Sequence, residues 1–154
     1  MGEVSRERTG WRDKGISERH RMWGVECQAT DIDFLLLEYY SNYDIVRPAA
    51  FIEYKNEHAQ KRNSNAVQYK AICAVSNSAN LPFFIVVYTS DFKNYRVIPM
   101  NKWARVCLDN ERTMTEADYV SFLYRLRRLN VPPNILAKIA TPKPQTSLFS
   151  SSSS

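Results

Sequence analysis

The pattern of apolar and polar residues predicts two adjacent strands in the first half of the chain. Residues 30–40, TDIDFLLLEYY, begin with charges and then become apolar on both alternating faces, which is typical of a strand covered on both sides. Residues 49–55, AAFIEYK, are apolar until their last positions. The short polar connection at 41–48, which ends in a proline, favours an antiparallel hairpin. We expect Tyr40 to pair with Ala49 across it.

The other apolar patterns predict an alternation of helices and strands. Helices are expected at 17–23, 66–79, 115–130 and 134–140, and further strands at 82–90 and 95–100. Thr115 has an acid three residues later and predicts the start of the long C-terminal helix. This order of elements predicts an α/β fold, with one mixed sheet flanked by helices on both faces.

Composition limits the organisation of the chain. Of its 154 residues, 44% are hydrophobic and 24% are charged, which suits one domain with a buried core. We expect a polar N-terminal arm at 1–15, a folded domain at 16–140 and a disordered Ser-rich tail at 141–154. The pattern contains neither a membrane-spanning stretch nor a secretory signal, so no membrane partner is expected.

Cysteine usage adds a negative prediction. Cys27, Cys73 and Cys107 lie far apart, no C-x-x-C occurs, and the two histidines stand alone. These spacings do not predict a structural zinc site. The odd number of cysteines fits a reducing compartment, and we expect a cytoplasmic location.

The net charge of +5 conceals an uneven distribution. Residues 25–57 contain seven acids and two bases, a net charge of −5, so the remaining chain carries +10. A basic periphery around an acidic strip favours a polyanionic partner.

Within this strip, acids and a lysine converge on one end of the predicted hairpin. Side chains alternate along a strand, so Asp31 and Asp33 share a face, as do Glu53 and Lys55. Neighbouring carboxylates repel unless a cation lies between them, and Mg²⁺ binds one or two carboxylates together with water and phosphate. A lysine on the same face can act on a water molecule or stabilise phosphate charge. The chemistry indicated is phosphodiester hydrolysis.

These residues resemble the motif of the PD-(D/E)xK nuclease superfamily, an acid on one strand and D/E-x-K on the next. Asp33 takes the first position, and Glu53-Tyr54-Lys55 takes the second. The order of the elements after the hairpin is also similar, so that the resemblance covers roughly residues 16–130. It implies a restriction-endonuclease-like αβββαβ core. The proline of the family name does not precede the acid here, a loss that other members share.

The resemblance also implies roles for individual residues. Asp33 and Glu53 would bind Mg²⁺ with the backbone carbonyl of Tyr54, Mn²⁺ is expected to substitute, and Lys55 would act on the attacking water. Asp31 competes with Asp33 as the primary ligand, and we prefer Asp33 because the apolar run starts directly after it.

Two helical residues extend this implied site. Gln68 is similar to a glutamine of RecB-type members, and Glu18 is placed like an acid that some members carry on their first helix. A second triplet, Asp91-Phe92-Lys93, lacks an acid-bearing partner strand, and we interpret it as a solvated turn.

The expected function is therefore a Mg²⁺-dependent nuclease with DNA as its substrate. Two alternatives stay open: a non-catalytic nucleic-acid-binding module, and a protein-interaction subunit whose acids form salt bridges. The residues do not determine whether the substrate is duplex, branched, single-stranded or RNA, or whether cleavage is endo or exo. In so short a chain, we expect specificity to come from structure-selective cutting, from a homodimer or from a partner protein.

Overall fold

A computed structural model of the chain describes residues 14–24, 26, 32–40, 45–59 and 67–140. Asp31, the tail and most of the N-terminal arm lie outside the described residues. The helices are α1 (Lys14–Met22), α2 (Val67–Ser78), α3 (Lys102–Cys107), α4 (Glu116–Leu126) and α5 (Pro133–Ala140), and the strands are β1 (Phe34–Tyr40), β2 (Ile45–Asn56), β3 (Phe83–Tyr88), β4 (Asn94–Pro99) and β5 (Arg112–Thr115).

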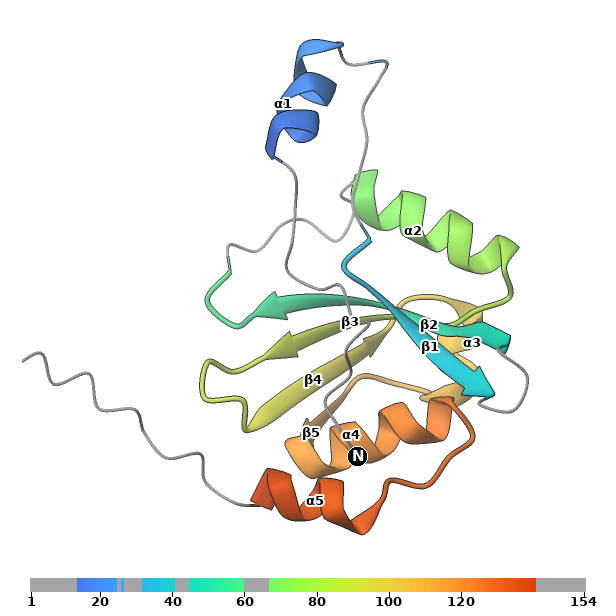
Figure 1. The fold of residues 1–154 in the computed structure, drawn as a ribbon, viewed down its shortest axis with the longest axis vertical. Helices are drawn as coiled ribbons and strands as arrows, with labels where there is room; N and C mark the ends of the chain where they lie inside the picture. Colours follow the sequence, from blue (N-terminus) through green and yellow to red (C-terminus); the bar gives the residue numbers. More distant parts are fainter. Residues whose placement is uncertain (1–13, 25, 27–31, 41–44, 60–66, 141–154) are drawn as a thin grey trace, which may run out of the picture.

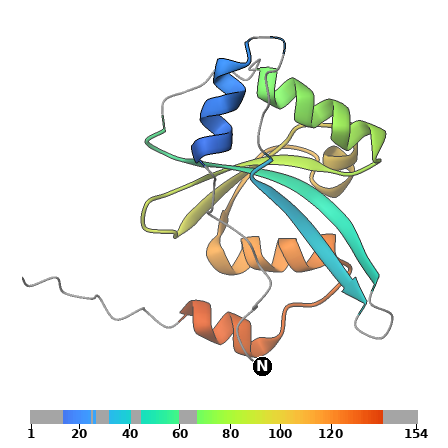
Figure 2. The ribbon, with the colours of Figure 1, turned by 45° about the horizontal axis from the view of Figure 1, so that its top comes forward.

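The five strands form one open mixed sheet in the order β1-β2-β3-β4-β5. The pair β2–β3 is parallel, and α2 connects these two strands, whereas the other three pairs are antiparallel. Helix α2 lies on one side of the sheet, and α4 and α5 lie on the other (Figure 1). The second view shows the same layers (Figure 2). The predicted α/β fold with one mixed, helix-flanked sheet is therefore correct.

Each face of the sheet carries its own hydrophobic core. The smaller core joins α2 to alternate residues of the two central strands: Phe51, Tyr69, Ile72, Phe83 and Ile85. The larger core lies between the sheet and α4, and it includes Ala50, Ile52, Phe84, Val86, Val97, Met114, Tyr119 and Phe122. The period of two along β2 and β3 thus separates the two cores. Among the described helices, none has the length and apolarity needed to cross a lipid bilayer.

The antiparallel hairpin forms, but its expected register is wrong. Tyr40 pairs with Ile45 rather than with Ala49, and β2 begins inside the segment that we expected to be a loop. A bulge between Leu36 and Leu37 shifts the pairing. Pro48 lies inside β2 at this bulge, and the pairing of β2 with β3 starts only at Phe51. Proline is tolerated there because no ladder on the β3 side needs its missing N–H.

The expectation that residues 30–40 form a strand covered on both faces is also wrong. β1 is an edge strand, and the side chains of Phe34 and Leu35 are 36% and 43% exposed. Apolar residues of β1 pack within the hairpin: the ring of Phe34 packs edge-on against Tyr54 of β2, with ring centroids 5.0 Å apart.

Two short elements were not predicted, namely α3 and β5. Their local periodicity is brief, and long-range contacts define them. Asn101 caps α3 by accepting from the Ala104 N–H at 2.9 Å, and β5 pairs with β4. The predicted start of the last long helix is correct: Thr115 Oγ accepts from the Asp118 N–H at 3.2 Å.

Candidate functional site

Glu53 is a buried charged residue in the middle of the sheet. Its strand, β2, has neighbours on both sides, and its side chain lies on the α2 face with only 1% exposed. Lys55, two residues later, lies on the same face, and its side chain is 27% exposed. An acid in such a position is costly unless it is paired or used.

The two carboxylate oxygens of Glu53 have different surroundings. Oε1 accepts a hydrogen bond from Lys55 Nζ at 2.7 Å and another from Gln68 Nε2 at 3.2 Å. Oε2 is buried, and it has no hydrogen-bond partner among the described residues. A buried oxygen without a donor costs about 1–3 kcal/mol, and more when it is charged. This oxygen is therefore the unexplained atom of the site.

Asp33 stands across the hairpin from Glu53. The register pairs Phe34 with Ile52, so its continuation by one residue sets Asp33 opposite Glu53. Burial raises the pKa of Glu53; the hydrogen bond from Lys55 opposes this rise, and the nearby carboxylate of Asp33 adds to it. Two acids and one lysine thus share one end of the hairpin on the α2 side.

The ammonium group of Lys55 is held by its neighbours. Burial acts to lower the pKa of Lys55, but the hydrogen bond and the negative charge of Glu53 outweigh it, so that the pKa is raised. The ammonium also lies 5.8 Å from the ring centroid of Tyr69 in the first turn of α2. Lys55 is therefore a cation near neutral pH.

Tyr54 points away from this cluster. Its ring lies on the opposite face of β2, where its hydroxyl is 2.6 Å from that of Tyr119. Burial raises the pKa values of both tyrosines. Only the backbone of Tyr54 is therefore available to the cluster, which is the part that the family resemblance implies.

The remaining candidate residues have different outcomes. Gln68 is brought into contact with Glu53. Glu18 is exposed on α1 and is not among the groups that shift the Glu53 pKa. Asp31 lies outside the described residues. The second triplet is an exposed turn, as expected, in which Asp91 Oδ1 accepts from Thr89 Oγ1 at 2.6 Å.

Tyr69 is a member of the cluster that sequence reasoning missed. Its position directly after Gln68 places it in the same helical turn, and an aromatic residue there is ordinarily assigned to the core. It is indeed 5% exposed and packs with Phe51 and Phe83. Its ring nevertheless lies 5.8 Å from the Lys55 ammonium, so Tyr69 belongs to both the core and the site.

The donor set indicates which ions the cluster could hold. Asp33 and Glu53 supply hard carboxylate oxygens, which suit Mg²⁺ or Mn²⁺ rather than zinc. Within the described ranges no group of three or more His, Cys, Asp or Glu side chains gathers. Two carboxylates are enough for a cation that keeps water and substrate phosphate as its other ligands.

Comparisons with known proteins do not add a family to this geometry. No family model, no curated protein and no solved structure matches the chain.

Proposed function

We propose that this protein is a divalent-cation-dependent nuclease that hydrolyses phosphodiester bonds, with DNA as its substrate. The observation that carries the proposal is the buried oxygen of Glu53, which has no hydrogen-bond donor among the described residues and which lies beside the Asp33 carboxylate. A buried oxygen of this kind is explained by an ordered water, a bound ion or a catalytic role. A divalent cation is the ligand that best fits two adjacent carboxylates.

The donor set is suited to such an ion. Glu53 Oε2 is free to bind it, Asp33 would supply a second oxygen, and the backbone carbonyl of Tyr54 is a third candidate. Mg²⁺, or Mn²⁺ in its place, would supply Lewis-acid stabilisation of charge on a phosphate and a more acidic water. Asp31 is kept as an additional candidate ligand on the basis of sequence alone.

The residues of the chain then have distinct tasks. Lys55 is a cation fixed within 2.7 Å of Glu53 Oε1, where it can orient the attacking water or stabilise negative charge that develops on the phosphate. Gln68 donates to the same oxygen, so that Oε2 is the carboxylate oxygen left for a ligand. Gln68 acts through Glu53, so it is a positioning residue.

We propose, further, that the sheet is a version of the restriction-endonuclease-like core. In support, the acid-bearing hairpin β1–β2 is followed by α2, by the parallel strand β3 and by β4. Between α1 and α2 the described residues contain two strands, whereas the αβββαβ order has three. The resemblance therefore rests on the hairpin, on α2 and on the strands β3 and β4.

The charge distribution supports a polyanionic substrate. The strip of −5 at 25–57 contains the cluster, and the remaining chain carries +10. Positive charge around an acidic centre attracts the phosphate backbone, and a bound cation would relieve the repulsion at the centre.

The test is cleavage of circular, linear, branched and single-stranded DNA, with RNA in parallel, in Mg²⁺, Mn²⁺ or EDTA. We expect the wild type to cut DNA with Mg²⁺ and not with EDTA. Lys55→Ala should lower the single-turnover rate by about 10²-fold or more, as removal of one charge-stabilising donor does. The matched control is Lys93→Ala, which removes the lysine of the second, exposed triplet and should cut at the wild-type rate.

Two results would overturn this proposal. One is a Lys55→Ala protein that cuts as fast as the wild type, because the cluster would then be a salt bridge. The other is salt-sensitive binding of DNA by the wild type without cleavage in any metal, which would identify a non-catalytic binding module.

A further inference from the structure

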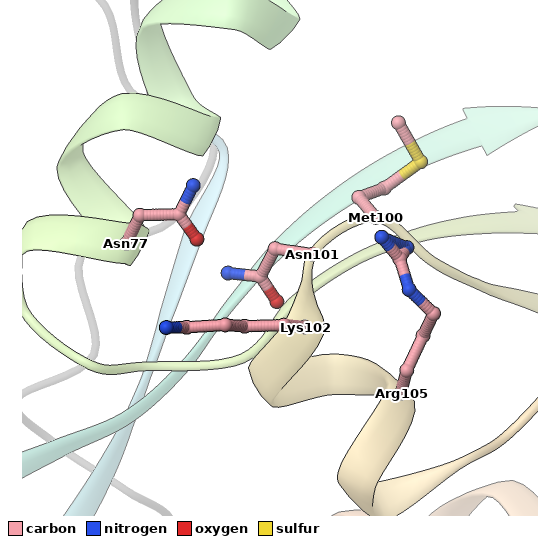
Figure 3. Close-up of a pocket in the computed structure, with 5 residues that line it drawn as sticks. All are labelled: Asn77, Met100, Asn101, Lys102 and Arg105. Atoms are coloured by element: carbon pink, nitrogen blue, oxygen red, sulfur yellow. The ribbon is translucent and has the colours of Figure 1, made fainter.

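A hollow lies at the far end of α2 from the cluster around Glu53. It has a volume of about 430 Å³ and is lined by Asn77, Met100, Asn101, Lys102 and Arg105. The close-up shows that Asn77 comes from α2, while Lys102 and Arg105 extend from α3 on either side of Asn101 (Figure 3). Two cationic side chains and the Asn77 amide make this a site for an anion rather than for an apolar ligand.

The wall of the hollow is rigid. Asn101 is 3% exposed, and its Nδ2 donates to Ser76 Oγ at 3.1 Å and to the Leu81 carbonyl at 2.9 Å. Its Oδ1 accepts from the backbone N–H groups of Phe83 and Ala104. Asn101 thereby ties the end of α2 to the start of α3 and fixes the base from which the two cations extend.

The two cations carry no carboxylate partner within the described part of the chain. Ion pairs there join Lys55 to Glu53, His58 to Glu57 and Arg96 to Glu111, but none involves Lys102 or Arg105. No acid among the described residues lines the hollow. Both side chains are exposed, so their charge is available to a ligand from solution.

The hollow and the cluster around Glu53 lie on the same side of the sheet. Tyr69, Cys73 and Asn77 are four residues apart and form one row along α2. Tyr69 supports Lys55 at one end, Cys73 Sγ approaches the Met100 carbonyl at 3.8 Å in the middle, and Asn77 lines the hollow. Eight residues of helix span about 12 Å.

This spacing matches a nucleic-acid strand. Phosphates of one strand advance about 3.4 Å per nucleotide along a duplex axis and also wind around it, so a direct separation of about 12 Å corresponds to about two nucleotides. We propose that Lys102 and Arg105, with the Asn77 amide, bind a backbone phosphate about two nucleotides from the bond that is cut. The inference rests on the proposed nuclease function and adds a substrate contact to it.

The test compares two double variants that remove the same charge. Lys102→Gln/Arg105→Gln empties the hollow of cations, while Arg125→Gln/Lys138→Gln removes two exposed cations from α4 and α5 on the other side of the sheet. Binding of a linear DNA duplex is measured against salt concentration in a Glu53→Gln background, which should not cut.

For the hollow variant we expect binding about tenfold weaker at moderate salt, and a slope of log affinity against log salt that is smaller by about 1. With Glu53 present, the cleavage rate at subsaturating DNA should fall by about the same factor as the affinity. The control pair should change the slope far less. Equal losses in both pairs, or no loss in either, would overturn the inference.

Neutral phosphates locate the contact. Once the cut position is known, a methylphosphonate about two nucleotides away should weaken binding to the Glu53→Gln protein and add no further loss to the hollow variant. Independent losses would assign the phosphate to other residues. Cleavage by the wild type separates the two ideas: if it cuts DNA and the hollow variant binds normally, the phosphate site fails and the nuclease function stands.

Discussion

Replacing Glu53 with glutamine should stabilise the protein in the absence of metal. The carboxylate is 1% exposed, and its Oε2 is buried without a donor among the described residues. The amide has nearly the same shape, carries no charge and can still accept from Lys55 through its oxygen. Burial is the largest cause of the raised Glu53 pKa, which means that the folded state prefers the neutral form.

The expected gain is set by the contacts of the carboxylate. An unpartnered buried oxygen costs about 1–3 kcal/mol and more when it is charged, and repulsion from the exposed Asp33 adds a small amount. The charge-assisted hydrogen bond from Lys55, which is 27% exposed, offsets much of this. We expect Glu53→Gln to raise the free energy of unfolding by about 1 kcal/mol at pH 8, or the melting temperature by about 2–4 °C in a domain of this size.

The gain should depend on pH in a defined direction. The Glu53 pKa is raised in the folded state, so the wild type has its full stability below the ordinary carboxyl pKa and loses stability as pH rises through the folded value. The advantage of the glutamine variant should therefore be small near pH 4.5 and largest at pH 8. Thermal unfolding followed by circular dichroism in EDTA measures both.

Magnesium should reverse the order if it binds at the proposed site. A cation held at Glu53 would stabilise only the wild type, by about 1.4 kcal/mol at ten times its Kd. Glu111→Gln is the control, because Glu111 pairs with Arg96 at the surface and should change stability by less than about 0.5 kcal/mol. Glu53→Gln could instead be less stable than the wild type by more than about 1 kcal/mol in EDTA at pH 8. In that case the carboxylate stabilises the fold through its salt bridge with Lys55, and the cost assigned to its burial is refuted.

Two further substitutions test the supporting structure. Asn101→Ala removes the α3 cap and leaves buried N–H groups without an acceptor, so it should lower the free energy of unfolding in urea by about 3 kcal/mol. The control Asn77→Ala, at an exposed position, should change this free energy by less than about 0.5 kcal/mol. Equal losses in the two variants would contradict the role of the cap. Tyr119→Phe removes the hydroxyl contact with Tyr54 and should lower the free energy of unfolding by about 1 kcal/mol. The cleavage rate should not change, because that contact lies on the face of β2 opposite Glu53. A large loss of activity at full stability would show that the two faces are coupled.

Part of the site is determined by local rules that act along the chain. Alternation along a strand is enough to set Glu53 and Lys55 on one face, whatever the strand pairs with. The helical pattern likewise predicts that Gln68 lies in the first turn of a helix, as it does in α2. This position follows from the steric preferences of neighbouring residues along the chain. The α/β fold class is predicted in the same way from the alternation of the two periods.

The decisive contacts depend on residues that are distant in the chain. A bulge between Leu36 and Leu37 shifts the hairpin register and sets Asp33 opposite Glu53, and no local pattern specifies such a shift because it arises from the fit between two strands. The burial of Glu53 depends on β3 and α2, which come after it in the sequence. The composition of the site is thus a local property, whereas the unpartnered oxygen that suggests its chemistry exists only once the sheet and α2 have packed together.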